Sequence, residues 1–481
     1  EYRSASYYEM AKIYFKTKEY TTALKYVQKS LESNANNYNA LKIEAIIYRV
    51  LREYSKASTI LSKIEDRDAT YNFSAFENYL KDPTLKKLNT FKEKTTNELP
   101  SQSYLELALN YYDLELFEES IKVLEIAPND AIVNYWLSFL YKKQGKFLEA
   151  KKALNTSLEA SSELVFPFRQ ETTHILETSL LEEDHWKTRY YLGLIYWHLN
   201  KKDKAKVYFE SCEMKPDFAP FYLARATLFS EQLKENQRDL HKALQLAKDD
   251  WKVNKRLSEF YTKKNSKEKA LYYAQKAYKV AKTNSGVIVH LAKTLLEQHD
   301  YLGCLKLLET HTLIPYEGFY EGRKIYYQAC VKKAFKSFKE KKYKEAIIFA
   351  NKSRAWPVNI GIGKPYHVDE RMADFIVALV KEQDNKVNEA NLYYTKVMNY
   401  KPSEITNDTP NLLVQLVADQ QLQSLSEVET VQQYLHDSKV LGKNFRWVKE
   451  KYADYNKTKK EIKDKILILH QILFNVPTLK N

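Results

Sequence analysis

Glycine and proline are scarce in this chain, with 9 and 12 copies among 481 residues. Tight turns in β-rich folds draw heavily on glycine, and proline interrupts helices. Their scarcity therefore points away from β-rich folds and towards helices. Apolar residues make up 44% of the chain, with 38 Tyr and 21 Phe, which is ample for a buried core.

Cysteine is rarer still, and its pattern argues against a disulfide framework and a zinc site. The three copies, Cys212, Cys304 and Cys330, show no CxxC spacing and are odd in number. A disulfide framework needs an even number, and a zinc site needs clustered ligands, so we expect small core residues instead. The histidines also lack metal-ligand spacing, and no metal or cofactor is predicted.

The chain has no run of about 18 apolar residues, so no membrane-spanning helix is predicted. It has no signal peptide, and it begins with Glu1 rather than Met. We therefore expect a piece cut from a longer protein, whose address label is missing. The compartment stays open, with the periplasm or cell envelope favoured over the cytoplasm.

Sequence motifs of common catalytic sites are missing too. The run Gly361-Ile362-Gly363-Lys364-Pro365 ends in proline and lacks the Lys-Ser or Lys-Thr of a phosphate loop, and GxSxG does not occur. The net charge is +14, but only 13 of the 76 basic residues are Arg, and no dense basic run alternates with aromatics. Nucleic-acid binding is therefore disfavoured against ordinary solvated lysine faces.

What the chain does contain is an internal repeat. A pattern of small and aromatic residues at the start recurs 34 residues later. The first copy is Ala11, Tyr14, Tyr20 and Ala23, and the second is Ala45, Tyr48, Tyr54 and Ala57. This is the tetratricopeptide period, in which small residues lie where two helices cross and aromatics fill the space between hairpins.

Seven further copies follow in order. They start near Leu107, Leu137, Leu192, Leu257, Leu291, Ala334 and Ala390. The pattern predicts an all-α fold: a tetratricopeptide-type solenoid of helical hairpins in a right-handed superhelix, with irregular loop insertions. The tyrosines at one shared position should be largely buried: Tyr14, Tyr48, Tyr111, Tyr141 and Tyr196.

Departures from the period divide the chain into three predicted parts. Residues 1–100 hold the first repeats and a Lys-rich linker over 66–100. Residues 101–405 form the central solenoid, and residues 406–481 a helical cap. The central part carries insertions at 158–186, 311–327 and 356–371.

Five unusual stretches, in order along residues 1–400, resemble a bacterial tetratricopeptide family. They are Asn97-Glu98-Leu99-Pro100 with Tyr104-Leu105-Glu106-Leu107-Ala108; Phe166-Pro167-Phe168-Arg169 with Glu171-Thr172; Trp186-Lys187 with Tyr190-Tyr191-Leu192; Pro216-Asp217-Phe218-Ala219-Pro220-Phe221-Tyr222-Leu223-Ala224-Arg225; and Trp356-Pro357-x-Asn359-x-Gly361-x-Gly363-Lys364-Pro365-Tyr366 with Asp369-Glu370-Arg371. This sequence departs from the family at Val358, where an acidic residue is commoner, and after residue 405.

The resemblance implies a larger protein with an N-terminal β-sandwich similar to galactose-mutarotase-like domains. The implied partner is that sandwich or another protein subunit. Mutarotase-like sandwiches often belong to carbohydrate enzymes, so carbohydrate is the alternative ligand, by analogy of fold alone.

The stretch 356–371 is the most irregular of all, because two glycines and two prolines fall within residues 357–365. Such a break is either a surface insertion or the place where a solenoid binds its partner. Its polar content favours binding, in a groove shared with the 165–171 insertion. The candidate binding residues are Arg169, Glu171, Trp186, Arg225, Trp356, Asn359, Lys364, Tyr366, Asp369, Glu370 and Arg371.

Each candidate also has a structural interpretation. Glu171 and Asp369 suit helix N-termini, Trp186 and Trp356 suit packing between hairpins, and Arg225 needs a carboxylate, for which Glu171 is one possibility. We expect a non-catalytic scaffold that binds a partner through its concave face and broken loops. The alternative is the helical part of a carbohydrate enzyme, with Glu171, Asp369 or Glu370 as acid and base about 5–9 Å apart.

Overall fold

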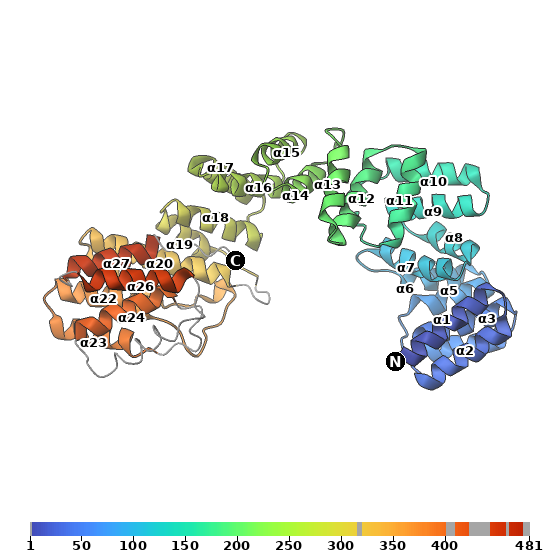
Figure 1. Ribbon diagram of the computed structural model, residues 1–481, viewed down its shortest axis with the longest axis horizontal. Coiled ribbons are helices and arrows are strands. Elements are labelled where there is room, and N and C mark those ends of the chain that lie inside the picture. Colours follow the sequence, from blue (N-terminus) through green and yellow to red (C-terminus); the bar gives the residue numbers. More distant parts are fainter. Residues whose placement is uncertain (1, 315–319, 401–408, 423–442, 458–460, 475–481) are drawn as a thin grey trace. The chain divides into compact units, whose positions relative to one another are not determined.

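The computed structural model describes residues 2–314, 320–400, 409–422, 443–457 and 461–474. All regular secondary structure in these ranges is helical, and no strand occurs in them (Figure 1). The chain divides into two compact units, Glu1–Gln232 and Leu233–Asn481, which are described one at a time. The predicted all-α fold of helical hairpins is confirmed.

The first unit consists of consecutive helices that pack mainly against their neighbours in the chain. They are α1 (Tyr2–Lys16), α2 (Tyr20–Ser33), α3 (Tyr38–Val50), α4 (Tyr54–Glu65), α5 (Asn72–Lys81), α6 (Leu85–Lys94), α7 (Pro100–Asp113), α8 (Phe117–Ile126), α9 (Ala131–Lys143), α10 (Phe147–Glu159), α11 (Glu171–Glu182), α12 (Trp186–His198), α13 (Lys202–Ser211) and α14 (Ala219–Leu228).

The second unit continues the same arrangement. Its described helices are α15 (Leu233–Leu246), α16 (Trp251–Lys263), α17 (Lys267–Val280), α18 (Ser285–Glu297), α19 (Tyr301–Thr310), α20 (Glu321–Lys339), α21 (Tyr343–Lys352), the short 3-10 helix η1 (Val358–Ile360), α22 (Arg371–Gln383), α23 (Val387–Met398), α24 (Thr409–Leu422), α26 (Lys443–Asn456) and α27 (Ile462–Phe474).

One turn geometry recurs between the two helices of a hairpin. In each such turn one residue has a φ between 53° and 72°, and the residues are Lys18, Arg52, Glu115, Gly145, Asn200, Asn265, His299, Lys341 and Asn385. The amide of the next residue donates to a carbonyl five positions back, as Lys201 does to Tyr196 over 2.8 Å. This left-handed C-terminal motif satisfies the last carbonyls of the first helix and turns the chain directly into the second.

The small repeat residues lie where the paired helices touch. Ala11, Ala23, Ala45 and Ala57 are all fully buried, as the 34-residue pattern predicts. Gly193 of α12 also lies where two paired helices touch, and there the helices are even closer. A Cβ built at Gly193 would lie 2.8 Å from the Phe209 ring on α13. The absence of a side chain therefore sets the distance between these helices.

Replacing Gly193 with alanine is expected to destabilise the α12–α13 hairpin by about 1–2 kcal/mol. Overpacking costs typically about 1–3 kcal/mol, and the better helix propensity of alanine returns up to about 1 kcal/mol. Hydrogen exchange of α12 and α13 peptides measures the change. The double variant Gly193→Ala/Phe209→Leu, which removes the colliding ring edge, should exchange more slowly than Gly193→Ala; unchanged exchange in Gly193→Ala would contradict the close approach.

The burial predicted for the shared tyrosine position is only partly correct. Tyr111 and Tyr196 are buried, but Tyr14, Tyr48 and Tyr141 are half-buried. The position lies in the last turn of the first helix, beside the left-handed turn, where packing covers only part of the ring. Tyr14 and Tyr196 each stack on a tyrosine of the second helix, Tyr26 and Tyr208, at an interplanar angle of 8°.

The stretch 66–100, expected to be a Lys-rich linker, contains the two helices α5 and α6. Three aromatic side chains anchor it, since Phe73, Phe76 and Phe91 are fully buried. Phe76 and Phe91 contact each other with ring centroids 4.9 Å apart. The lysines therefore occupy the solvated face of amphipathic helices.

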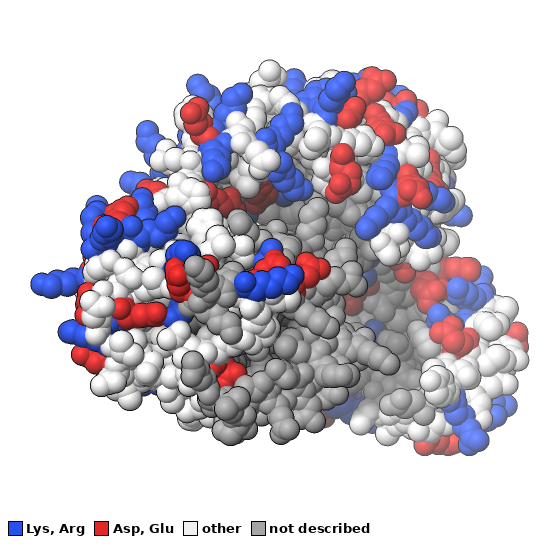
Figure 2. Space-filling view, turned by 60° about the vertical axis from the view of Figure 1, so that its left-hand side comes forward, with Lys and Arg blue, Asp and Glu red and all other residues white. Residues whose placement is uncertain are grey.

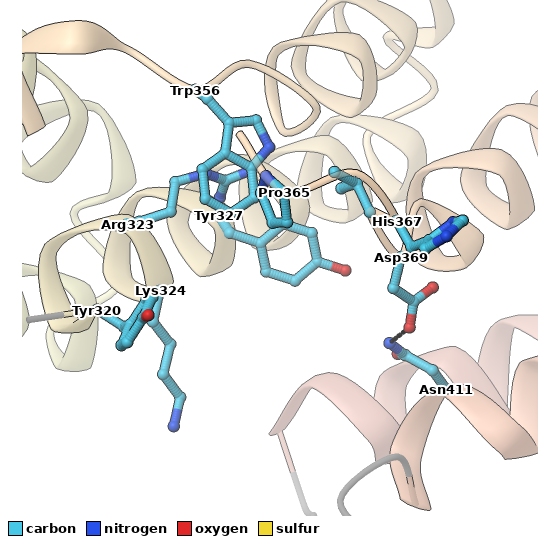
Figure 3. A pocket seen from close by; sticks show the side chains of 10 residues that line it. Tyr320, Arg323, Lys324, Tyr327, Trp356, Pro365, His367, Asp369 and Asn411 are labelled. Atoms are coloured by element: carbon cyan, nitrogen blue, oxygen red, sulfur yellow. Dashed lines mark hydrogen bonds between the residues drawn. The ribbon is translucent and has the colours of Figure 1, made fainter. Parts of the chain in front are cut away.

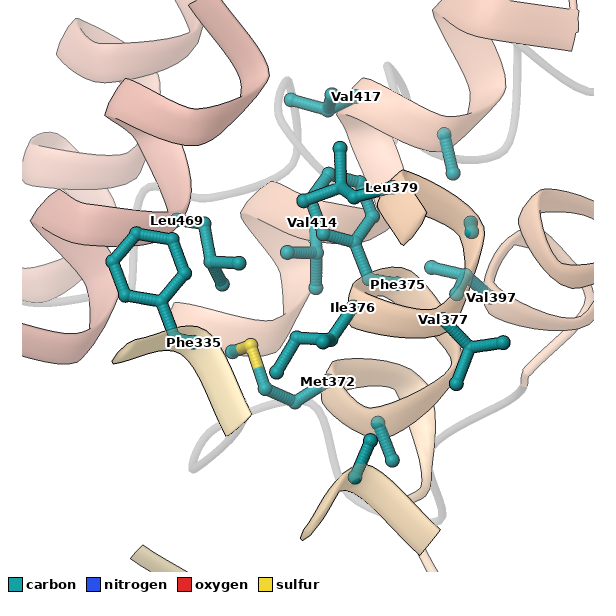
Figure 4. Packing of buried hydrophobic residues seen from close by; sticks show 14 of the residues in the cluster. Phe335, Met372, Phe375, Ile376, Val377, Leu379, Val397, Val414, Val417 and Leu469 are labelled. Carbon is teal, nitrogen blue, oxygen red and sulfur yellow. The ribbon is translucent and has the colours of Figure 1, made fainter. Parts of the chain in front are cut away.

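The C-terminal part of the second unit is organised around α22. Residues 371–380 of this helix are all buried, which explains the nearly continuous apolar run Met372–Val380. Phe375 and Ile376 belong to one buried hydrophobic core with Val414 of α24 and Leu469 of α27 (Figure 4). Helices on several sides cover α22, so it cannot show the one-sided pattern of a surface helix.

The predicted insertions differ in content. Residues 158–186 contain an irregular loop and then α11, and residues 356–371 contain a loop with η1. Of the 311–327 insertion, residues 315–319 lie outside the described residues, as do residues 401–408 and 423–442 of the predicted solenoid end and cap. The division at residues 100 and 405 stays a prediction.

Candidate partner-binding site

The predicted site residues fall into both units, and each group is described within its own unit. Arg169, Glu171, Trp186 and Arg225 belong to the first unit, and the residues of 356–371 to the second. The groove that the two groups are predicted to share stays a prediction.

Arg169 lies in the loop between α10 and α11. Its guanidinium lies 4.9 Å from the Phe168 ring centroid, and its Nη2 is 3.5 Å from Glu106 Oε2 on α7. The neighbouring Leu164 and Phe166 are exposed. The loop is therefore held to the preceding hairpins while its apolar side chains face solvent.

Glu171 and Trp186 occupy helix starts. Glu171 is the exposed first residue of α11, where a carboxylate interacts favourably with the helix dipole. Trp186 begins α12, is half-buried, and meets Phe221 edge-on with ring centroids 6.4 Å apart. Both positions match the structural interpretation better than a binding role.

Arg225 is buried, at 3% exposure, but Glu171 does not neutralise it. Its Nη1 donates to the carbonyl of Glu213 over 2.6 Å and to that of Phe209 over 3.3 Å, at the end of α13. Within the described residues no hydrogen bond or ion pair joins Arg225 to Glu171. Glu171 is therefore not the partner of Arg225, and carbonyls of partial negative charge at the C-terminus of α13 help to hold the guanidinium.

In the second unit, Asn359 anchors the broken loop instead of facing a ligand. Its Nδ2 donates to the carbonyls of Leu308 and His311, each over 2.7 Å, and its own carbonyl accepts from the amide of Leu313. Ile360 beside it is buried. The Asn359 side-chain amide thus satisfies two carbonyls at the end of α19. These hydrogen bonds fix the position of the loop against that helix.

Arg371, expected in an open groove, is buried at 1% exposure. Its Nε and Nη2 donate to Asp369, and its Nη1 donates to Gln415 Oε1 on α24 over 2.9 Å. A tertiary contact that the sequence does not reveal, between α22 and α24, encloses this side chain. Arg371 therefore stabilises the fold.

Two of the three carboxylates of the alternative enzyme hypothesis, Asp369 and Glu370, are paired with arginines. Burial raises the pKa of Asp369, but hydrogen bonds and the charge of Arg371 outweigh burial and hold that pKa below its ordinary value of 3.8. Glu370 forms an ion pair with Arg354 Nε over 3.1 Å. A general acid needs a raised pKa, so this arrangement does not favour Asp369 in that role.

A pocket of about 350 Å³ lies beside the broken loop, at the start of α20 (Figure 3). Its lining is mostly aromatic and apolar, and comes from α20, the loop and α24: Tyr320, Arg323, Lys324, Tyr327, Trp356, Pro365, His367, Val368, Asp369 and Asn411. Of the predicted residues, Trp356 and Asp369 line it. Lys364 and Tyr366 are exposed on the loop, Tyr366 fully.

Arg323 is the pocket residue that the sequence interpretation did not select. Its guanidinium lies 4.3 Å from the Trp356 ring centroid, and its Nη2 donates to the carbonyl of Ser353 at the end of α21 over 2.8 Å. It is one of only 13 arginines in a lysine-dominated chain, and it lies within the predicted 311–327 insertion. Its rarity and its position in an insertion are the two sequence features that could have marked Arg323 as a candidate.

Comparison of the sequence with known protein families agrees with the repeat pattern and the hairpins. A family described as "Tetratricopeptide repeat" matches residues 4–37, 131–163 and 187–214. Tetratricopeptide repeats are therefore present in the chain. The matched ranges correspond to the hairpins α1–α2, α9–α10 and α12–α13, and the fold is a tetratricopeptide-type solenoid.

Three solved structures match the chain at low sequence identity. The APC/C hetero-tetramer Cut9–Hcn1 is 13% identical and covers 86% of this chain and 96% of its own, with a TM-score of 0.27. Yeast Tom70 is 12% identical, with coverages of 90% and 99% and a TM-score of 0.28. PilF of Pseudomonas aeruginosa is 16% identical, with coverages of 50% and 96% and a TM-score of 0.28. No curated protein matches the chain.

The described part of the chain holds neither a membrane-spanning helix nor a cluster of metal ligands. No helix there is long and apolar enough to cross a membrane, and no group of three or more potential metal ligands gathers there. On the face drawn in Figure 2, basic and acidic side chains are interspersed. That face does not offer the single-signed surface of a nucleic-acid site.

Proposed function

We propose that this tetratricopeptide-repeat chain is a non-catalytic scaffold that binds a partner protein through the pocket and the exposed loop beside α20. The partner we propose is the β-sandwich of the larger bacterial protein that the sequence motifs resemble, or another subunit of its assembly. One observation carries the proposal: the loop is anchored at Asn359 and Asp369, yet exposes Lys364 and Tyr366 between those anchors.

Anchoring at both ends supports a binding role because it reduces the entropy that a partner must remove. A mobile loop loses conformational freedom on binding, whereas a loop held in one shape does not. Tyrosine supplies a large, rigid contact surface, and is enriched among residues that dominate binding energy. The pocket next to it offers the concave surface into which a partner side chain can insert.

The test places a photoreactive p-benzoylphenylalanine at Tyr366 of the full-length protein. The matched control position is Leu392 on α23, which is 65% exposed in the same unit. We expect a single protein or domain to cross-link from position 366 and not from position 392. Mass spectrometry identifies it as the predicted β-sandwich or another subunit, and the purified partner is then used to measure the dissociation constant.

Lys364→Ala and Tyr366→Ala should each weaken that binding about tenfold, as truncation of a central contact residue does. Neither side chain is buried, so neither variant should change the helical circular dichroism. Equal cross-linking from both positions, or wild-type affinity in both variants, would show that the loop is only a surface insertion.

A further inference from the structure

Arg323 is a buried cation without an acidic partner among the described residues. It is only 7% exposed, yet its single hydrogen bond to a described residue goes to the neutral carbonyl of Ser353. Its Nε is buried and has no hydrogen-bond partner in the described part of the chain. The other arginines of the second unit whose side chains are described, Arg238, Arg256, Arg354 and Arg371, each form an ion pair with an aspartate or a glutamate.

Burial without a counter-ion is costly for a guanidinium. Desolvation lowers the pKa of Arg323, and the groups that oppose it are thiol and phenol side chains, not carboxylates. The stacked Trp356 ring and the partial charge at the end of α21 offset part of this cost. The remainder would be offset by an anion bound next to Arg323, since buried charges are normally paired.

The charges around the pocket favour an anion as well. Lys324 adds a second positive charge at the exposed edge. The one lining carboxylate, Asp369, is already bound by Arg371 Nη2 over 2.7 Å and by Asn411 Nδ2 over 2.6 Å. The local balance is therefore positive (Figure 3).

The size and the lining of the pocket indicate what the anion is attached to. Tyr327, Trp356 and Val368 present aromatic and apolar surface, and Trp356 Nε1 is a buried donor without a partner among the described residues. A volume of about 350 Å³ lies at the lower end of the range for ligand pockets, about 300–1,000 Å³, so it accommodates a side chain or a small acid. An apolar group joined to one carboxylate complements both the walls and the charge.

We infer that this pocket binds a carboxylate joined to an apolar group, presented by an acidic, hydrophobic segment of the partner protein, with Arg323 as its counter-ion. The inference rests on the proposed function and names the chemistry that the partner must carry. The carboxylate comes from an aspartate or glutamate side chain, or from the carboxyl terminus of the partner, and Arg323 binds both in the same way.

The experiment uses the full-length protein labelled with 5-fluorotryptophan, followed by fluorine NMR. The sequence has six tryptophans, and the Trp356→Phe variant identifies the Trp356 signal by its loss. The probes are 3-phenylpropionate, its uncharged amide 3-phenylpropanamide, and acetate. We expect both probes to shift the Trp356 signal, with a dissociation constant at least tenfold lower for 3-phenylpropionate than for the amide. Acetate should give no saturable shift.

Two peptides then separate the sources of the carboxylate. One carries a Phe-Glu pair between an acetylated and an amidated end, and the other ends in a phenylalanine with a free carboxylate. Whichever shifts the Trp356 signal at lower concentration identifies the source. If neither binds more tightly than its fully amidated, uncharged counterpart, the assignment to a protein segment is overturned.

Arg323→Gln should abolish the preference for the acid over the amide, and Arg323→Lys should keep part of it. Lys344→Gln, which removes an exposed positive charge on α21, is the matched control and should leave the preference unchanged. Equal binding of acid and amide by the wild type, or a preference that persists in a folded Arg323→Gln, overturns the inference. The wild-type comparison decides the matter even if Arg323→Gln does not fold.

The same materials separate failure of this inference from failure of the proposed function. If the partner cross-links at position 366 but 3-phenylpropionate does not compete and Arg323→Gln binds normally, the scaffold role stands and the carboxylate site falls. If the propionate binds as expected while no partner cross-links at position 366, the acid site stands and the scaffold role falls.

Discussion

Replacing Glu77 with alanine should destabilise the middle of the first unit by about 3–5 kcal/mol, because it breaks a buried ion pair. Glu77 is fully buried on α5, and its Oε2 is 2.7 Å from Arg49 Nε on α3. Its Oε1 accepts from the Tyr111 hydroxyl on α7 over 2.8 Å. One carboxylate therefore joins three helices that are distant in sequence.

The size of the effect follows from what the substitution leaves behind. Burial and then the charge of Glu77 raise the pKa of Tyr111 well above 10.0, so its hydroxyl keeps its proton and must donate it. Without Glu77 that donor has no acceptor, and Arg49 keeps only Glu119, 3.0 Å from its Nη1. An unsatisfied buried donor and a half-neutralised buried charge both disfavour the folded state.

Hydrogen exchange of the α3, α5 and α7 peptides measures this change locally. Glu77→Gln keeps an acceptor for Tyr111 and loses only the charge, so it should fall between wild type and Glu77→Ala. Lys87→Ala breaks a mostly exposed ion pair with Asp82 on the same stretch, and should change stability by less than about 0.5 kcal/mol. Equal exchange in Glu77→Ala and wild type would show that the network does not stabilise these helices.

Arg371→Met is expected to cost about 3–5 kcal/mol in the second unit, and any loss of partner binding should follow from that loss of structure. The substitution leaves Asp369 and Gln415 Oε1 without their main donor, beneath α24. Exchange should rise in α22 and α24 and stay unchanged in α16 and α17. Weaker binding with unaltered exchange would instead place Arg371 at a ligand.

The ion pair between Arg371 and Asp369 also predicts that the stability of the second unit depends on pH. Because Arg371 holds the folded-state pKa of Asp369 below its ordinary value, the pair contributes fully above the unfolded pKa near 3.8. That contribution is lost as the pH falls through the folded value. The stability of α22 relative to α16 should therefore decrease on acidification below about pH 4 in wild type, and the decrease should be smaller in Asp369→Asn.

The site shows where prediction from sequence stopped. Gly361, Pro357 and Pro365 correctly indicated a break in the helices, because these residues restrict the backbone wherever they occur. The polar residues around them could not be sorted in the same way. Asn359 and Arg371 form hydrogen bonds within the protein, whereas the side chains of Lys364 and Tyr366 are exposed to solvent. Burial depends on which helices cover the loop, and the covering helix α24 lies about 40 residues away in sequence.

The sequence by itself determined the hairpins. Ala11 and Ala45, repeated at one interval, mark helix crossings because only a small side chain lets two helices approach so closely. Only the tertiary structure decided which charges are paired. Arg49 meets Glu77 across 28 residues, whereas Arg323 meets no acidic side chain among the described residues. Repeat spacing is a property of neighbours along the sequence, but a charge is neutralised by whatever lies within a few ångströms, and that depends on how the helices stack.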